Sequence, residues 1–459
     1  MGKCGLFMHS VQHPEGKPPA PAGFDEADPE AQASEIAYFS QCADFPERAR
    51  DLAALFGSRL LECGVERLKR KNGPRLAAVL GHPEERARLF PVTQEGIFLA
   101  HAAVAPISGP AQVAMDHWTA EAAAGRQESD AVWRGVRQTR EVAAKFLGCS
   151  WDEVSLLGPT ALGLGLVAQG ISWKEGDEVV YDPLDYPANV YPWVDLIRRG
   201  VRPVALPRKP GEEIRWEALR PVITAKTRLV SLATAHYLSG QQPELAVIGP
   251  ELKSRGILLC LDAIQTLGVL PTAWEEADFL AADAHKWMLG PVGAGVFMVR
   301  RRAWEQLLPP LLGSWNVVSP DFLAQPKIVM EEGGRRYEPG SLNLPGVEGM
   351  RASLELLQEL GPEQVSAHAL ALAGRVREGA REKGFSIYGE EKKNENRVIT
   401  TLREPSGGWE KTKQRMEKEG IRLSWRKEHG GQMLLRVSPH ASNTAGEIDH
   451  FLEVLGRAD

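Results

Sequence analysis

The chain has 459 residues, of which 43% are hydrophobic and 25% charged, a composition typical of soluble globular proteins. The length predicts two or three domains, and the composition excludes a fibrous or largely disordered chain. The formal net charge is −6, from 54 basic and 60 acidic residues. Because phosphate binding needs a basic surface, a nucleic acid is not the expected partner, and we expect a small-molecule substrate instead.

The five cysteines are scattered and never form a C-x-x-C pair, which predicts neither a disulfide framework nor a zinc site. No apolar run approaches the roughly 18 residues needed to span a membrane. The first residues also lack the apolar core of a signal peptide. We therefore expect a cytoplasmic protein that holds no metal and does not bind a membrane.

Residues 1–85 are expected to form an N-terminal extension of unassigned role. Residues 11–30 are rich in proline, alanine and glycine, which predicts an extended arm. Residues 47–63 place apolar side chains on one helical face. Since no chemistry is recognisable in this stretch, we expect an appended helical segment that packs on the main body or on a partner.

From about residue 86 the pattern changes, and short strands alternate with helices. Apolar spacing over 131–147 predicts a helix. The expected strands are Val154–Leu157, Glu178–Tyr181, Arg202–Leu206, Arg228–Ala233, Ile257–Asp262, Asp278–Ala282 and Gly295–Val299. The helices expected between them are Ala188–Arg199, Trp216–Val222 and Leu245–Arg255. This alternation predicts a large α/β domain over residues 86–345, with a mostly parallel seven-stranded sheet flanked by helices.

Residues 346–459 are expected to form a smaller α+β C-terminal domain. Two long helices are predicted over 347–360 and 362–384, followed by strands Asn396–Leu402 and Gln432–Ser438 and a closing helix that ends at Leu455.

Two charged side chains follow neighbouring predicted strands. The apolar run Ile257–Asp262 ends in a carboxylate, and Lys286 follows the next strand. Because the carboxyl ends of parallel strands meet at one edge of a sheet, we expect both side chains there. A lysine can form a Schiff base, while an aspartate keeps a pyridinium nitrogen protonated so that the ring accepts electrons. For these two residues alone, a surface salt bridge is the alternative.

The neighbouring sequence favours the first interpretation. Cys260–Gly268 reads CLDAIQTLG and Ala281–Gly295 reads AADAHKWMLGPVGAG. Together they resemble the class V aminotransferase family, and the resemblance extends from about Phe90 to Leu455. This family of fold-type-I pyridoxal-phosphate enzymes includes cysteine desulfurases, kynureninase-like enzymes and isopenicillin N epimerase-like proteins. The resemblance therefore implies the fold-type-I transferase fold and pyridoxal 5'-phosphate as the cofactor.

The resemblance also implies roles for individual residues. Lys286 would bind the cofactor as a Schiff base and then move the α-proton of the substrate, and Asp262 would pair with the pyridine nitrogen. Gln265 would donate to the phenolate oxygen of the cofactor, and His285 would flank its phosphate. Tyr186, in the segment DYPANVYPW, would stack on the cofactor ring.

The cofactor phosphate is expected at the N-terminus of the helix that follows the strand Val154–Leu157, because free N–H groups there bind anions. Thr160 and the amides of Ala161 and Leu162 are the expected cradle. Ala161 and Leu162 stand where the family usually has Ser or Thr and then Glu, so side-chain anchoring is thinner. Asp283 stands where desulfurases carry a phosphate-binding serine, and its carboxylate would repel phosphate unless it orients a donor.

Three further residues complete the expected site. Ser341 matches a family loop that reaches the phosphate of the neighbouring subunit, which implies a homodimer with shared active sites. Arg436, in the strand MLLRVSPH, would bind the α-carboxylate of an amino acid substrate with its planar fork of donors. Asn189 would contribute to the substrate site.

Several reactions fit these residues. A desulfurase needs a mobile thiol near the cofactor, and no cysteine follows Cys260, which lies within a predicted strand. Transamination is the main expectation, while β-elimination, C–S cleavage and epimerisation stay open because all begin with loss of the α-proton to Lys286. A catalytically inactive interaction protein is an alternative of another class. A nicotinamide dehydrogenase is disfavoured, since the G-x-G-x-x-A string from Gly163 to Ala168 falls inside a helix.

Overall fold

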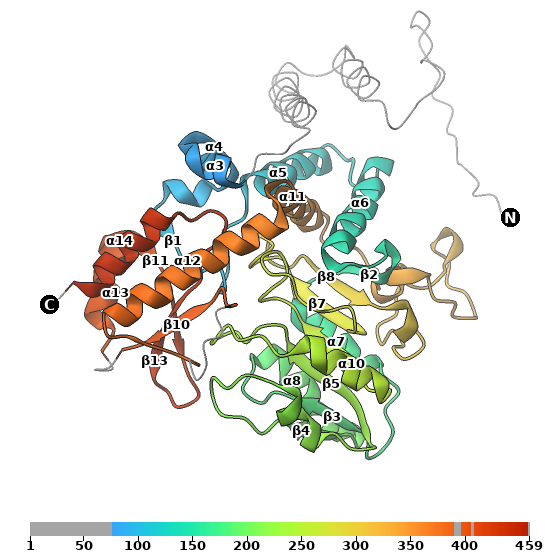
Figure 1. Cartoon of the computed structure of the whole chain (residues 1–459). Coiled ribbons are helices and arrows are strands. Elements are labelled where there is room, and N and C mark those ends of the chain that lie inside the picture. The colour runs from blue at the N-terminus through green and yellow to red at the C-terminus, as the bar shows by residue number, and fades with distance from the viewer. Residues whose placement is uncertain (1–75, 390–395, 405–407, 458–459) are drawn as a thin grey trace, which may run out of the picture. The chain divides into compact units, whose positions relative to one another are not determined.

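The structure is a computed structural model that describes residues 76–389, 396–404 and 408–457 (Figure 1). The expectations for residues 11–30 and 47–63 lie outside this part of the chain. A seven-stranded sheet has the strand order β2-β8-β7-β6-β5-β3-β4. Its strands are β2 Val154–Leu157, β3 Glu178–Tyr181, β4 Arg202–Ala205, β5 Thr227–Ala233, β6 Leu258–Asp262, β7 Phe279–Asp283 and β8 Gly295–Val299. Only β8 runs antiparallel to its neighbours, so the predicted mostly parallel sheet is confirmed.

Helices cover both faces of this sheet, because alternate side chains of each strand point to opposite sides. In β6, Leu259 and Leu261 pack with α6 and α10 on one face, while Cys260 packs with α7 and α8 on the other. These helices are α6 Asp130–Leu147, α7 Thr160–Gly170, α8 Tyr191–Val194 and α10 Leu245–Ser254. The strands are apolar on both faces because helices cover each face of the sheet.

The segment predicted as a helix over 188–199 differs from the expectation. It consists of three short pieces: η3 Pro187–Asn189, α8 Tyr191–Val194 and η4 Asp195–Arg199. Pro192 lacks the backbone N–H that a continuous helix would need to bond residue 188, which explains the interruption between η3 and α8. The predicted Trp216–Val222 is similarly divided into α9 Trp216–Leu219 and η5 Arg220–Val222.

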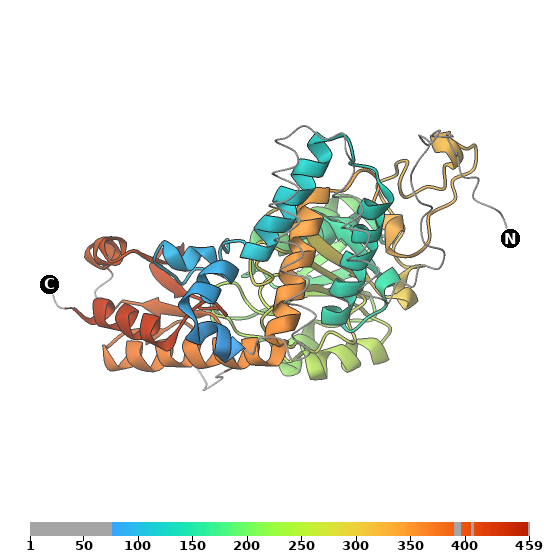
Figure 2. The same cartoon turned by 90° about the horizontal axis from the view of Figure 1, so that it is seen from above.

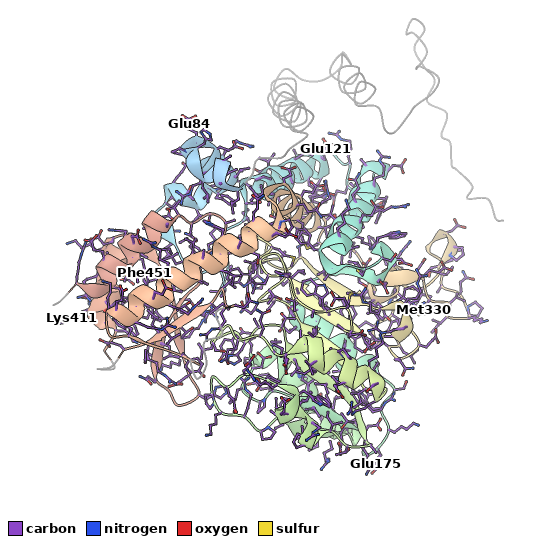
Figure 3. The ribbon with its side chains drawn as sticks, in the orientation of Figure 1. Glu84, Glu121, Glu175, Met330, Lys411 and Phe451 are labelled. Carbon is purple, nitrogen blue, oxygen red and sulfur yellow. The ribbon has the colours of Figure 1, made fainter. Side chains whose placement is uncertain are left out.

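A second, four-stranded antiparallel sheet has the strand order β12-β13-β10-β9. Its strands are β9 Ser386–Ile387, β10 Thr400–Arg403, β12 Ser424–Lys427 and β13 Met433–Val437. α12 Pro362–Glu382, α13 Glu410–Lys418 and α14 Ala445–Gly456 accompany it (Figure 1). Phe451 of α14, labelled in Figure 3, packs in the apolar core that this sheet shares with α12.

A short parallel pair connects an early segment of the chain to this C-terminal region. β1 Ile97–Phe98 pairs with β11 Ile421–Arg422, and Ala100 forms a bridge with Ser438. The Leu99 N–H donates to the Arg422 carbonyl at 2.9 Å. Residues 97–100, which the sequence assigned to the large domain, therefore pair with strands of the C-terminal region.

The remaining helices lie around these sheets. α11 lies alongside α5 and α6 (Figure 2). The helices not yet given are α3 Leu76–Gly81, α4 Pro83–Leu89, α5 Gly109–Ala123 and α11 Leu344–Leu360, with the 3-10 turns η1 Pro91–Gln94, η2 Trp151–Glu153, η6 Arg301–Ala303, η7 Pro320–Phe322 and η8 Gly333–Tyr337. Of the helices in the described ranges, none is both long and apolar enough to cross a membrane.

Candidate active site

Asp262 and Lys286 lie at the same edge of the large sheet. β6 and β7 are neighbouring parallel strands, with Asp262 in register with Ala281, and Lys286 follows β7. Asp262 is buried, and its Oδ1 accepts from the Ile264 N–H at 3.0 Å. Burial raises the pKa of Asp262 to about 6, although this hydrogen bond and the charge of Lys286 act in the opposite direction. Asp262 is therefore a buried carboxylate that is ionised at neutral pH.

Lys286 is a buried primary amine. Burial lowers the pKa of Lys286 to about 8; the charge of Asp262 raises it, and the charges of Arg436 and Arg426 lower it further. The Nζ atom lies 5.7 Å from the ring centroid of Tyr186. Because only a neutral amine is a nucleophile or a base, this environment activates Lys286 near neutral pH.

Tyr186 presents an aromatic ring beside this amine. Half of its surface is exposed, and the ring packs edge-on against Tyr237 with the centroids 5.6 Å apart. Its backbone is fixed because the Tyr186 N–H donates to Asp185 Oδ1 at 2.7 Å. The side chain is therefore held by its neighbours and keeps much of its surface accessible.

Asn189 lies in a buried hydrogen-bond network and has no exposed surface. Its Nδ2 donates to Asp185 Oδ2 at 2.9 Å, while its Oδ1 accepts from Trp193 Nε1 at 3.0 Å and from Ser231 Oγ at 2.7 Å. Asp185 in turn accepts from the backbone of Tyr186. Because its amide is engaged in supporting the Tyr186 segment, this arrangement gives Asn189 a role in shaping the site rather than a direct contact with substrate.

The N-terminus of α7 carries part of the predicted phosphate cradle. Thr160 Oγ1 accepts from the Asp283 N–H at 3.0 Å, so its hydroxyl proton is still available to a ligand. The Leu162 N–H donates to the Pro159 carbonyl at 2.8 Å, so this predicted cradle amide is engaged within the first turn. Ala161 occupies the second helical position, where backbone N–H groups have no partner within a helix. The structure thus brings Thr160 and Ala161 together as donors.

Asp283 organises the loop around Lys286. Its Oδ1 accepts from the His285 N–H at 3.3 Å and lies 2.9 Å from His285 Nδ1. Its Oδ2 accepts from the Gly293 N–H at 3.3 Å. The carboxylate therefore orients His285 and holds the loop closed. Because its oxygens are engaged by these groups, a carboxylate at this position is compatible with a nearby anion.

Gln265 is buried with a fixed amide orientation. Its Oε1 accepts from Trp287 Nε1 at 2.9 Å, and its Nε2 donates to the Ala102 carbonyl at 3.3 Å. Since an indole N–H only donates, the amide cannot be reversed. One Nε2 proton is left for a ligand oxygen.

Ser341 is exposed on the loop before α11. Two residues later, Asn343 donates to the Gly293 carbonyl at 3.1 Å and accepts from the Gly346 N–H at 3.3 Å as the N-cap of α11. This cap holds the loop against the segment that follows Lys286. The exposed position of Ser341 leaves its hydroxyl accessible to a second chain.

Arg436 is buried on β13 without a carboxylate partner in the part of the chain that the structure describes. Its Nη1 donates to the Tyr237 carbonyl at 2.6 Å and its Nη2 to Ser424 Oγ at 3.2 Å, while its buried Nε has no acceptor. Burial, and then the charge of Arg426, lower the pKa of Arg436 to about 9. A buried cation with an unused donor is costly unless an anionic ligand binds it.

The sequence analysis missed two residues of this site. Tyr237 packs on Tyr186 and accepts from Arg436, and Arg426 lies on β12. The signal for Arg426 is the alternation in Ser424-Trp425-Arg426, which places every second side chain on one face. That signal was not usable because β12 was not predicted as a strand.

The chemistry of these donors fits pyridoxal phosphate. A buried amine of lowered pKa suits its aldehyde, and a buried carboxylate suits its ring nitrogen. A partly exposed aromatic ring lies beside the amine, and an eleven-residue helix begins with free donors suited to a phosphate.

Comparisons with known proteins point to one family. The family model of class V aminotransferases matches residues 97–451. The chain is 27% identical to a probable cysteine desulfurase of Methanothermobacter thermautotrophicus, over 63% of this chain and 73% of the relative. It is 24% identical to an uncharacterized aminotransferase of Bacillus subtilis, YcbU, over 81% of this chain and 96% of the relative.

A solved structure shares the fold. The apo structure of a cysteine desulfurase from Thermococcus onnurineus superposes with a TM-score of 0.74 at 22% identity, over 82% of this chain and 97% of that chain. Because the family model covers most of the sequence, the chain belongs to the aminotransferase class V family and is a pyridoxal-phosphate-dependent enzyme of fold type I.

Proposed function

We propose that this enzyme transaminates an amino acid, with Lys286 as the residue that moves the α-proton. The observation that carries the proposal is the buried Lys286 amine of lowered pKa beside the Asp262 carboxylate. Bound pyridoxal phosphate supplies the electron sink for the electron pair left at the α-carbon. Lys286 Nζ takes the proton from that carbon, and its flexible stem lets it return the proton to a different atom, which distinguishes transamination from epimerisation.

The other residues position the reactants. Asp262, ionised at neutral pH, would stabilise a protonated ring nitrogen, and Gln265 would donate its remaining proton to the ring oxygen. Tyr186 would define the plane of the ring, since an aromatic contact is worth about 1 kcal/mol beyond area burial. Arg436 would bind the α-carboxylate with its unused Nε and its remaining protons.

Three residues would hold the phosphate. Thr160 offers its hydroxyl proton, Ala161 its backbone N–H at the positive end of α7, and His285 a ring oriented by Asp283. Leu162 contributes through the helix dipole rather than through its own amide, which is engaged with Pro159.

A β-elimination that releases part of the substrate side chain is the second candidate, and the desulfurases among the relatives favour it. Of the cysteines in the described ranges, Cys260 is buried in β6 and Cys149 is partly buried in a turn. Burial raises the pKa of Cys149 to about 12, and it also raises the pKa of Cys260. Since a thiolate is the sulfur acceptor in desulfuration, neither side chain suits a protein persulfide, and elimination would release its product directly.

A homodimer with shared active sites and a cytoplasmic location are part of this proposal. Val292, which neighbours Gly293 beside the Asn343 cap, is 65% exposed. A surface hollow of about 600 Å³ lies beside Ala161 and is lined by the 69% exposed Tyr191. Exposed apolar side chains on both sides of the site favour a covering partner, and sedimentation equilibrium of the loaded enzyme tests for it.

The first experiment combines the purified chain with pyridoxal phosphate, reduces it with borohydride and maps the modified peptide. We expect a reduced adduct on Lys286 and none in Lys286→Ala, whereas Lys253→Ala, which removes an exposed lysine paired with Glu276, should label normally. A wild-type chain that binds the cofactor without an adduct on Lys286 would contradict the assignment and favour an inactive interaction protein.

Product analysis then separates the two reactions. In transamination, each active site converts one equivalent of amino acid to the 2-oxo acid and stops unless a second 2-oxo acid is added. In β-elimination, ammonia is released continuously without an amino acceptor. Continuous ammonia release would therefore overturn transamination in favour of the second candidate.

A further inference from the structure

A second arginine lies on the same face of the small sheet as Arg436. Ser424 is in register with Arg436 across β12 and β13, and Ser424 Oγ accepts from Arg436 Nη2 at 3.2 Å. Side chains alternate along a strand, so Arg426, two residues after Ser424, points to the same face. Arg436 and Arg426 are therefore diagonal neighbours across the pair of strands, within reach of one ligand.

Neither guanidinium is neutralised by a carboxylate within the described ranges of the chain. Arg426 Nε is buried and has no acceptor among those residues, and the same is true of Arg436 Nε. The nearest carboxylate along β12, Glu428, is engaged by Arg403. Two partly or fully buried cations without counter-ions are unfavourable in isolation, because burying an unpaired charge is costly.

The position of Arg426 relative to the reactive amine supports a role toward substrate. Arg436 Nη1 donates to the Tyr237 carbonyl at 2.6 Å, the Tyr237 ring packs against Tyr186, and the Tyr186 ring lies 5.7 Å from Lys286 Nζ, so the arginine pair of β12 and β13 adjoins the side of the site where Tyr186 and Tyr237 meet. One α-carboxylate needs only one bidentate arginine fork. An amino acid with a neutral side chain would leave Arg426 without an anion.

We propose that the substrate carries a second anionic group, a carboxylate or a sulfinate on its side chain, and that Arg426 binds this group while Arg436 binds the α-carboxylate. This inference deepens the proposed function and rests on it for the placement of the amino acid. Arg426 is then the residue that determines specificity, since an amide in place of the side-chain anion leaves its guanidinium unpaired. Discrimination by an unpaired buried group is stronger than discrimination by shape alone.

The test uses the cofactor-loaded full chain and pairs of ligands that differ only in charge. Visible-absorption titrations give dissociation constants for L-aspartate against L-asparagine, for L-glutamate against L-glutamine, and for L-cysteine sulfinate. Calorimetric titration with succinate against propionate measures anion binding without requiring any reaction of the amino group. The amino acid that binds most tightly shows whether the side-chain anion of the substrate is a carboxylate or a sulfinate.

We expect the acidic member of at least one pair to bind about 10- to 100-fold more tightly than its amide, the range for hydrogen bonds to a charged group. Arg426→Gln should abolish that preference and leave the amide's dissociation constant within about threefold. Arg422→Gln is the matched control, because Arg422 is exposed and its side chain donates to the Glu95 carbonyl at 3.4 Å, away from the Arg426 guanidinium on the neighbouring strand. The control should keep the full preference.

Two outcomes overturn the inference: equal binding of acids and amides by the unmodified enzyme, or equal weakening of both by Arg426→Gln. The proposed function fails separately. If no amino acid changes the absorption spectrum while succinate binds in an Arg426-dependent manner, the anion site stands and transamination does not. If amino acids change the spectrum without regard to charge, amino acid binding stands and the anion site does not, and the product analysis decides between transamination and β-elimination.

Discussion

Replacing Asn189 by alanine tests whether this side chain supports the Tyr186 segment or contacts the substrate directly. The substitution removes the acceptor of two buried donors, Trp193 Nε1 and Ser231 Oγ, and one donor to Asp185. A buried polar group without a partner costs about 1–3 kcal/mol. Two such donors predict a loss of about 2–6 kcal/mol in the free energy of unfolding, with a displaced Tyr186 segment as the consequence.

Urea unfolding of the cofactor-free chain measures this loss, and Gln169→Ala, on the exposed side of α7, is the control that should change stability by less than about 0.5 kcal/mol. Asn189→Asp keeps an acceptor for Trp193 and Ser231 but brings a carboxyl group against Asp185. Burial raises the pKa of Asp185 to about 8, so the two carboxyl groups can share a proton at pH 6. This variant should therefore be more stable at pH 6 than at pH 9.

The reasoning is refuted if Asn189→Ala unfolds within about 1 kcal/mol of the unmodified chain while the dissociation constant of the amino acid rises tenfold. That result would indicate a direct contact between Asn189 and the substrate in place of the supporting role.

Two further predictions concern the reactive pair. The rate at which pyridoxal phosphate forms a borohydride-reducible adduct should rise through about pH 8, because burial lowers the pKa of Lys286 and only the neutral amine attacks. A midpoint above pH 10 would instead be that of an ordinary exposed lysine. Asp262→Asn should retain the adduct but slow the exchange of the substrate α-proton with deuterated water by about 100-fold or more, since it removes the charge opposite the ring nitrogen. NMR measures this exchange, and an unchanged exchange rate would contradict the role of Asp262.

The strands of the large sheet were predictable because they are continuous apolar runs with defined ends. β2, β3 and β8 have the expected bounds, β4, β5 and β6 differ by one residue at one end, and β7 is shifted by one residue at both ends. The C-terminal region was harder, because β9 of the small sheet and β11, which pairs with β1, have only two residues each and are defined by pairing with strands elsewhere in the chain. The local sequence pattern does not show which strand elsewhere in the chain such a short segment pairs with.

The candidate site divides in the same way. Asp262 and Lys286 were predictable because each directly follows a buried strand of one sheet. Arg426 and Tyr237 were not, since their proximity to Lys286 depends on how the small sheet meets the loop after β5. The sequence also located the start of the helix that contains Leu162. It did not show that the Leu162 amide is already engaged in a hydrogen bond within the first turn.

The pairing of β1 with β11 has a consequence for the order of folding. The ribosome releases residues 97–100 before any strand of the large sheet, yet their partners Arg422 and Ser438 are synthesised only after every strand of that sheet. The large sheet can assemble from neighbouring segments while β1 is still unpaired, since domains generally fold as units during synthesis. Residues 97–100 must then wait until β11 has been synthesised, so a chain stalled on the ribosome before residue 420 should leave β1 unpaired and accessible to chaperones and proteases.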